Sequence, residues 1–185
     1  MYGIKPLNFK TTQSNSLKKY PKKSLFSSIF YVYSKNLYRK KKEMEYSEYR
    51  SQLTSCPFCN EIIPISETKN FYITLARAPY TKDHILVVPK KHVIFLNELT
   101  KEEQQELRET VNVRNNIMLK HYHGTSILLR DAHENGTSGK SIGHLHAHIV
   151  PDCWIGALTG DNEDDRHFFE EDEYQELIQD AKNRF

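Results

Sequence analysis

The chain has 185 residues, enough for one ordinary domain with an extension and too few for two large domains. Its 38% hydrophobic and 27% charged residues indicate a soluble protein, and no apolar run approaches the length of a membrane-spanning helix. The net charge of +2 hides an asymmetry: residues 1–42 hold eleven of the 26 Lys and Arg and none of the 24 Asp and Glu, which leaves a net charge of −9 on residues 43–185.

Residues 1–42 form a basic extension whose composition fits more than one role. They are rich in Lys, Ser, Asn and Tyr, which is typical of an organelle transit peptide and equally of a solvated or poorly ordered arm. A nucleic-acid-binding arm is a third reading. The apolar patch at 25–33 is interrupted by polar residues, so we do not expect secretion. We expect a cytoplasmic protein or, if the arm is a transit peptide, an organellar one.

A Cys-x-x-Cys pair follows a short amphipathic helix that we expect within residues 43–53. Cys56 and Cys59 are two of only three cysteines, too few for a disulfide framework, so they favour a reducing compartment or a metal. A redox pair would need a following thioredoxin-like βαβ unit, which the sequence lacks. As half of a tetrahedral zinc site the pair needs two more ligands, and two buried thiols without a metal are the alternative.

Two runs, 71–77 and 84–89, are rich in aromatic and β-branched residues. A turn that contains Pro79, Thr81 and Asp83 separates them, so we expect an antiparallel pair of strands.

A capping-box pattern, Thr100 with Glu103, begins a long helix that we expect to end at Gly124. Residues 126–131 then return as a strand. The apolar stripe of the helix consists of Leu107, Val111, Met118 and Tyr122.

The loop at 135–141 combines glycines, hydroxyl groups and backbone N–H groups that could surround a phosphate. It is not a P-loop, because Gly139, Lys140 and Ser141 are followed by a strand rather than a helix. A simple polar loop is the alternative.

Residues 143–151 hold the most informative pattern in the chain. In an extended backbone, His144, His146 and His148 line one face, and the intervening Leu145, Ala147 and Ile149 line the other. A helix would scatter the three rings. The pattern predicts three imidazoles side by side over an apolar backing. A metal site is one reading, and a surface strand that happens to be rich in histidine is the other.

The sequence from His144 to Val150 resembles the histidine triad motif, in which single hydrophobic residues separate three histidines and two more follow. In that family the middle histidine attacks the α-phosphorus of a nucleotide, so the resemblance implies that His146 is the nucleophile. A neutral imidazole suits this role, because it can be both nucleophile and leaving group. One ring nitrogen must be held as N–H, and we expect a nearby backbone carbonyl to accept its proton.

The resemblance also implies the other site residues. His148 would neutralise developing charge, Ser141 would assist, and the substrate contacts would come from Asn135, Gly139, Lys140, Ser141 and His148. Lys140 stands where several members carry glutamine. A structural zinc ion would be held by Cys56, Cys59, His92 and His144, unless His144 belongs to the catalytic group.

The same resemblance marks two departures from the family pattern. Asp83 replaces the usual glycine before a histidine, and Ala76 stands where one branch of the family has an acidic residue that holds the ribose.

The chain ends with an acidic stretch at 161–165, expected to be exposed, and a helix with acidic residues at its N-terminal end. The apolar stripe of this helix consists of Tyr174, Leu177, Ile178 and Ala181.

We therefore predict an α+β fold, with a histidine-triad-like domain at 43–160, an antiparallel sheet carrying a long helix, and an acidic linker and C-terminal helix at 161–185. The predicted function is a nucleotide hydrolase or nucleotidyl transferase acting at the α-phosphate of a dinucleoside polyphosphate or nucleoside phosphoramidate. We also expect a homodimer and no membrane partner. The alternatives are a nucleotide- or nucleic-acid-binding module without turnover and an aprataxin-like deadenylase.

Overall fold

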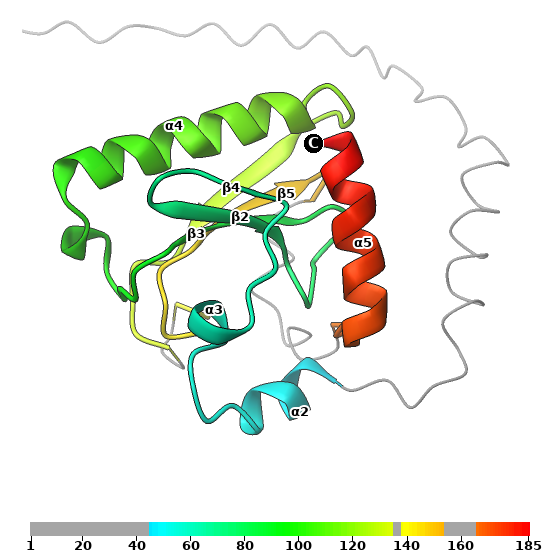
Figure 1. Cartoon of the computed structure of the whole chain (residues 1–185), viewed down its shortest axis with the longest axis horizontal. Coiled ribbons are helices and arrows are strands. Elements are labelled where there is room, and N and C mark those ends of the chain that lie inside the picture. Colours follow the sequence, from blue (N-terminus) through cyan, green and yellow to red (C-terminus); the bar gives the residue numbers. More distant parts are fainter. Residues whose placement is uncertain (1–44, 135–137, 154–165) are drawn as a thin grey trace, which may run out of the picture. The chain divides into compact units, whose positions relative to one another are not determined.

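The computed structural model describes residues 45–134, 138–153 and 166–185 (Figure 1). The basic extension at 1–42, Asn135 and the acidic stretch at 161–165 lie outside these residues, so what we expect of them stays a prediction. Contacts divide the chain after Lys41, and residues 42–185 form one compact unit. Among the helices that the structure describes, none is long and apolar enough to cross a membrane.

The described residues fold into an antiparallel sheet with helices, which confirms the α+β prediction. The strand order is β1-β2-β3-β5-β4, and every neighbouring pair is antiparallel. The strands are β1 (Ser66–Glu67), β2 (Phe71–Leu75), β3 (Ile85–Pro89), β4 (Thr125–Leu129) and β5 (Ala147–Pro151). The helices are α2 (Tyr46–Ser51), α3 (Pro57–Asn60), the 3-10 helix η1 (Leu96–Glu98), α4 (Lys101–Met118) and α5 (Glu171–Arg184).

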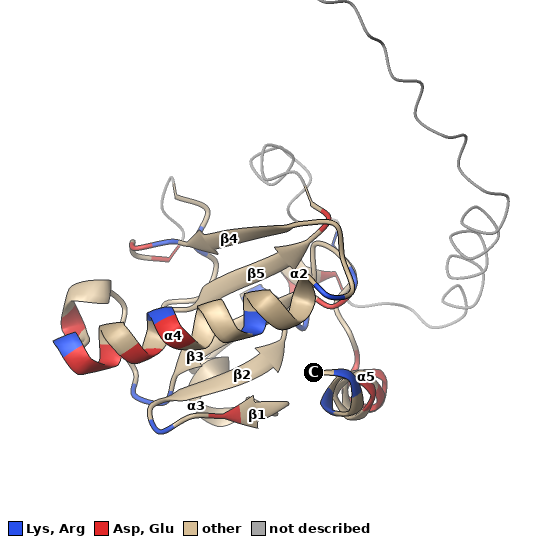
Figure 2. Cartoon of the chain, turned by 90° about the horizontal axis from the view of Figure 1, so that it is seen from above, with Lys and Arg blue, Asp and Glu red and all other residues tan. Residues whose placement is uncertain are grey.

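The two faces of the sheet pack against different parts of the chain. Alternate residues of β2, β3 and β5 enter the main core together with apolar residues of α4 and α5. Figure 2 shows α4 running across this face. On the opposite face a smaller cluster forms from Ala76, Leu86 and Val88, against which Phe58 and Ile62 pack. The histidines that alternate with the core residues of 143–151 therefore face the side that carries α3.

Helix α4 begins where the capping box predicts. The Thr100 hydroxyl accepts from the backbone N–H of Glu103, and the Glu103 carboxylate accepts from the N–H of Thr100. The prediction for its end is wrong, because α4 stops at Met118 rather than at Gly124. The backbone N–H groups of His121 and Tyr122 both turn back to the Met118 carbonyl, which closes the helix. Tyr122 still packs on the main core, as do Leu107, Val111 and Met118.

Strand β5 also begins later than the histidine alternation suggests. Its ladder starts at Ala147, and the two residues before His146 hydrogen-bond elsewhere. The N–H of Leu145 donates to Val93 O at 2.7 Å, and that of His144 to Ile142 O at 2.8 Å. The first two histidines of the motif thus stand outside the strand.

The turn before β3 is fixed by a buried ion pair. Asp83 has a φ of 62°, a left-handed conformation that Asp tolerates better than most residues. Its carboxylate accepts two hydrogen bonds from Arg184, at 2.6 and 2.7 Å, and one from the Tyr122 hydroxyl. Burial raises the pKa of Asp83, but these hydrogen bonds outweigh it and hold the pKa below its ordinary value. The last turn of α5 is thereby tied to the residue that precedes His84.

We expect Arg184→Gln to lower the free energy of unfolding by about 3 kcal/mol, because it leaves the Asp83 carboxylate, only 3% exposed, without its cation. Urea unfolding at neutral pH measures this. The matched control is Asp180→Asn, which removes the exposed ion pair at the other side of the same guanidinium and should cost less than about 0.5 kcal/mol. Equal losses in the two variants would contradict a special role for Asp83.

Candidate active site

His146 is oriented by the backbone of its own motif. Its Nδ1 lies 2.7 Å from the carbonyl oxygen of His144. A carbonyl only accepts, so Nδ1 carries the proton and Nε2 keeps a lone pair. The ring is 6% exposed, and burial lowers its pKa to about 4. His146 is therefore a neutral imidazole with one nitrogen available for attack, and the His144 carbonyl is the acceptor that the sequence analysis expects.

Two further histidines, His84 and His148, form a hydrogen-bonded pair beside His146. His84 Nε2 and His148 Nδ1 are 2.9 Å apart, and the backbone N–H of Tyr80 points to His84 Nδ1 at 3.3 Å. His84 Nδ1 must then be the acceptor, so His84 Nε2 carries a proton and donates it to His148. Burial lowers the pKa of His84 to about 3 and that of His148 well below its ordinary value. Both rings are therefore neutral.

This order of donors fixes the tautomer of His148. Because its Nδ1 accepts, its Nε2 must carry the proton. That Nε2 is buried and has no hydrogen-bond partner among the described residues. His148 lines the same pocket as His146, with ring centroids 4.6 Å apart. The site thus presents a lone pair on His146 and an N–H donor on His148, an arrangement suited to nucleophilic attack with stabilisation of negative charge.

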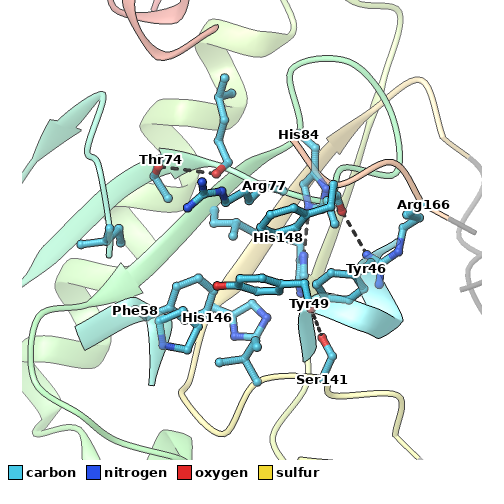
Figure 3. Close-up of a pocket in the computed structure, with 18 of the residues that line it drawn as sticks. Tyr46, Tyr49, Phe58, Thr74, Arg77, His84, Ser141, His146, His148 and Arg166 are labelled. Atoms are coloured by element: carbon cyan, nitrogen blue, oxygen red, sulfur yellow. Dashed lines mark hydrogen bonds between the residues drawn. The ribbon is translucent and has the colours of Figure 1, made fainter. Parts of the chain in front are cut away.

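The pocket over these rings is small. Its volume is about 80 Å³, smaller than the roughly 300–1,000 Å³ that is usual for ligand pockets. Figure 3 shows Tyr46 and Tyr49, from α2, lying over the histidines, with Phe58 against His146. The Tyr46 hydroxyl is 2.7 Å from Ser141 Oγ. A nucleotide therefore has to contact or displace the residues that cover the pocket.

The polar loop contributes unevenly. Ser141 lines the pocket, and Gly139 has a φ of 69°, which favours glycine. Lys140 does not line it: its side chain is buried, and Nζ donates to Ile94 O at 2.7 Å. Asn135 is outside the described residues. The structure thus brings Ser141 to His146 and His148, while substrate contacts from Asn135, Gly139 and Lys140 stay predictions.

The sequence analysis assigns no role to four residues that line the pocket. Tyr46 comes from α2, and Arg166 comes from the segment just before α5. Arg130 donates to the Tyr80 hydroxyl at 3.3 Å. These contacts join distant segments and have no sequence signal. His84, the fourth residue, does have a sequence signal, because it is a histidine at the start of a buried strand, directly after the turn.

The candidate metal ligands come together on the far side of the motif. The group consists of Cys56, Cys59, His92 and His144. Each residue offers one ligand atom, and the four ligand atoms all lie within 4.8 Å of one another. The Cys56 Sγ to His144 Nδ1 and Cys59 Sγ to His92 Nδ1 distances are both 3.3 Å. Tetrahedral zinc with usual bond lengths separates such ligands by roughly 3.5 Å. The group can therefore hold a metal ion.

His144 faces this group rather than the pocket. Its Nε2 lies 3.0 Å from Pro89 O and donates to it, so Nδ1 is the nitrogen with a lone pair, and Nδ1 points to the two thiols. A carbonyl that orients a ligating imidazole in this way is usual at metal sites. His144 is not among the residues that line the pocket.

Comparison with known proteins identifies the family of the chain. A model of the HIT domain matches residues 61–153, half of the chain. The chain belongs to the HIT domain family. Helices α2 and α3 and the segment from 166 to the end of α5 lie outside the matched residues, and with them Tyr46 and Arg166.

Curated relatives share modest identity with this HIT protein. An uncharacterised HIT-like protein of Mycoplasma genitalium is 28% identical over 143 residues, 72% of this chain and 99% of its own length. A bis(5'-adenosyl)-triphosphatase of Dictyostelium discoideum is 30% identical over 73 residues, 40% of this chain and 48% of its own. One of Saccharomyces cerevisiae is 31% identical over 88 residues, 46% of this chain and 41% of its own. The chain thus spans under half the length of these triphosphatases.

Solved structures share the fold. A histidine triad nucleotide-binding protein from Sulfolobus tokodaii superposes with a TM-score of 0.52 at 26% identity, covering 70% of this chain and 91% of that one. The NitFhit protein of Caenorhabditis elegans gives a TM-score of 0.55 at 22% identity, covering 86% of this chain and 37% of that one.

We expect buried, neutral His84 to make stability depend on pH. Its folded pKa is about 3, whereas an unfolded histidine protonates near ~6.5. The contribution of His84 to the free energy of unfolding is complete above the pKa of the unfolded state. It is lost as the pH falls toward the pKa of the folded state. Between pH 7 and pH 5, protonation of this group in the unfolded state should lower the free energy of unfolding of the wild type by about 2 kcal/mol.

Chemical denaturation at the two pH values measures this effect. In His84→Gln, the loss of stability between pH 7 and pH 5 should be smaller by the same amount. The control is His123→Gln, because the His123 side chain is fully exposed and its replacement should leave the pH dependence unchanged. If His84→Gln loses as much stability as the wild type, His84 is not held neutral.

Proposed function

We propose that this HIT protein is a nucleotide hydrolase that acts at the α-phosphate of a nucleotidyl compound through a covalent nucleotidyl-His146. The observation that carries the proposal is the hydrogen bond from His146 Nδ1 to the His144 carbonyl, which leaves Nε2 unprotonated over the pocket. The bis(5'-adenosyl)-triphosphatase relatives support a dinucleoside polyphosphate as substrate. A nucleoside phosphoramidate is the other compound class.

The steps follow from the two tautomers. His146 Nε2 attacks the α-phosphorus, an N–P bond forms, and the bond to the leaving group breaks. The His148 Nε2–H donates to the oxygen on which charge develops, and Ser141 assists at the same side. Water then attacks the phosphorus of the adduct, the N–P bond breaks, and one proton of the water passes to solvent. The nucleoside monophosphate is released, and His146 is again neutral with its proton on Nδ1.

We also propose that the Cys56, Cys59, His92 and His144 group holds a structural zinc ion. Four protein ligands leave no open position for an activating water, so the ion would take no part in the reaction. It would instead join α3, which carries the thiols, to the residue whose carbonyl orients His146. A homodimer is a further proposal, supported by the position of β4 at the edge of the sheet, since an edge strand is a template for pairing with a second chain.

We expect His146→Ala to lower kcat/KM by at least about a thousandfold, about 4 kcal/mol of barrier. The fold should persist, because the ring lines a pocket rather than the main core. Rapid quenching of the wild type with bis(5'-adenosyl) triphosphate, followed by mass spectrometry, should show one adenylyl group on His146. A variant that keeps more than about a tenth of the activity would rule out the covalent step, and binding without any turnover by the wild type would favour a binding module.

Metal analysis tests the zinc proposal. Protein prepared without chelators should contain about one zinc per chain, and Cys56→Ser or Cys59→Ser should lose the metal together with much of the thermal stability. The matched control is Cys153→Ser, since Cys153 is not in a disulfide and does not belong to the four-residue group. Wild-type protein without stoichiometric metal would exclude the site.

A further inference from the structure

Arg166 is held between two aromatic rings at the edge of the pocket. Its guanidinium carbon lies 4.4 Å from the centre of the Tyr80 ring and 4.5 Å from that of Tyr46. One of its nitrogens donates to the Ala78 carbonyl at 3.1 Å. Cation–π contacts on both faces and a hydrogen bond in the plane fix the orientation of a guanidinium. The cation is therefore placed by α2, the turn after β2 and the segment before α5 together.

This cation stands next to the histidine pair. The Tyr80 ring stacks on His84 at 5.2 Å and lies 6.2 Å from His148. Arg130 reaches the same ring through the Tyr80 hydroxyl. The charges of Arg130 and Arg166 both help to lower the pKa values of His84 and His148, although burial is the larger cause. Figure 3 shows Arg166 beside Tyr46 at the side of the pocket away from Phe58.

Beyond His146 the pocket presents an apolar surface, and the charged Arg77 and Glu61, which also line the pocket, pair with each other. Phe58 packs edge-on against His146 at 5.1 Å. Ile62 and Phe58 pack on the small cluster that contains Leu86, and all three line the pocket. The order along the site is thus apolar surface, His146, His148, and then the cationic end. A compound with an aromatic base at one end and phosphates at the other matches this polarity.

We propose that Arg166 and Arg130 bind the phosphate of the leaving group and make this protein selective for substrates whose leaving group is a polyphosphate rather than a neutral amine. The inference rests on the proposed function, in which His146 attacks the α-phosphorus. The nucleoside then lies toward Phe58, and the departing phosphates lie toward Arg166. A guanidinium matches phosphate oxygens in charge and in geometry. Tyr46, Arg130 and Arg166 all line the pocket, so a substrate that fills it contacts them.

Two substrates with the same adenylyl group separate this role from a structural one. Bis(5'-adenosyl) triphosphate leaves an anionic nucleotide, and adenosine 5'-phosphoramidate leaves ammonia. We expect Arg166→Gln to lower kcat/KM by about 30-fold or more for the first and by less than about threefold for the second. Arg166→Lys keeps the charge and should retain part of the discrimination. A merely structural Arg166 would change both substrates alike.

Arg77→Gln is the matched control. Arg77 also lines the pocket, and it also stacks on two rings, those of Phe168 and Tyr174, at 5.0 and 5.2 Å. It pairs with Glu171, and the two rings that it contacts do not include Tyr80, the ring that stacks on His84. We expect Arg77→Gln to leave the ratio of the two kcat/KM values unchanged. Arg130→Gln serves as the second variant if Arg166→Gln does not fold, and it should shift the ratio in the same direction.

Binding separates a failure of this inference from a failure of the proposed function. In His146→Ala, calorimetry should show tighter binding of the triphosphate than of the phosphoramidate, and adding Arg166→Gln should remove most of the difference. If the wild type turns over both substrates and the arginine variants leave their ratio unchanged, the phosphate subsite is overturned and the hydrolase stands. If the wild type turns over neither, the hydrolase fails. In that case the calorimetry decides: a preference for the triphosphate that Arg166→Gln removes supports the phosphate subsite, and its absence overturns it.

Discussion

The site depends on the hydrogen bond from His146 Nδ1 to the carbonyl of His144. That carbonyl is available because the ladder of β5 begins only at Ala147. Had the strand begun at His144, its neighbours would compete for the same carbonyl. The departure of the backbone from the sheet therefore sets the tautomer of the proposed nucleophile.

The remaining histidines extend the same principle. A backbone N–H at Tyr80 fixes His84, which fixes His148, so each proton in the site is placed by main-chain groups rather than by a charged partner. Burial keeps all the rings neutral at physiological pH. A neutral donor and a neutral nucleophile do not repel each other, and both become more effective where water is excluded.

The sequence predicts the parts of this arrangement that repeat with a period or follow local chemistry. Alternation in 143–151 assigns histidines to one face and apolar residues to the other, and the capping box places the start of α4. The contacts that join remote segments have no such signal: Arg184 to Asp83 spans 101 residues, and Tyr46 to Ser141 spans 95. The contact of Lys140 is of the same kind: its ammonium donates to the Ile94 carbonyl 46 residues away, and the substrate contact that the family resemblance implies for it stays a prediction.

Asp83 shows how the segments outside the HIT match depend on the domain and support it. The family pattern has glycine at this position, which fits a φ of 62° without strain. Aspartate keeps that conformation but adds a buried carboxylate, which is stable only with a cation beside it. Helix α5 supplies that cation through Arg184, and the segment just before α5 supplies Arg166 to the pocket. The C-terminal segment therefore supports the residue next to His84 at one end and lines the proposed site at the other, so a change that loosens α5 should affect both.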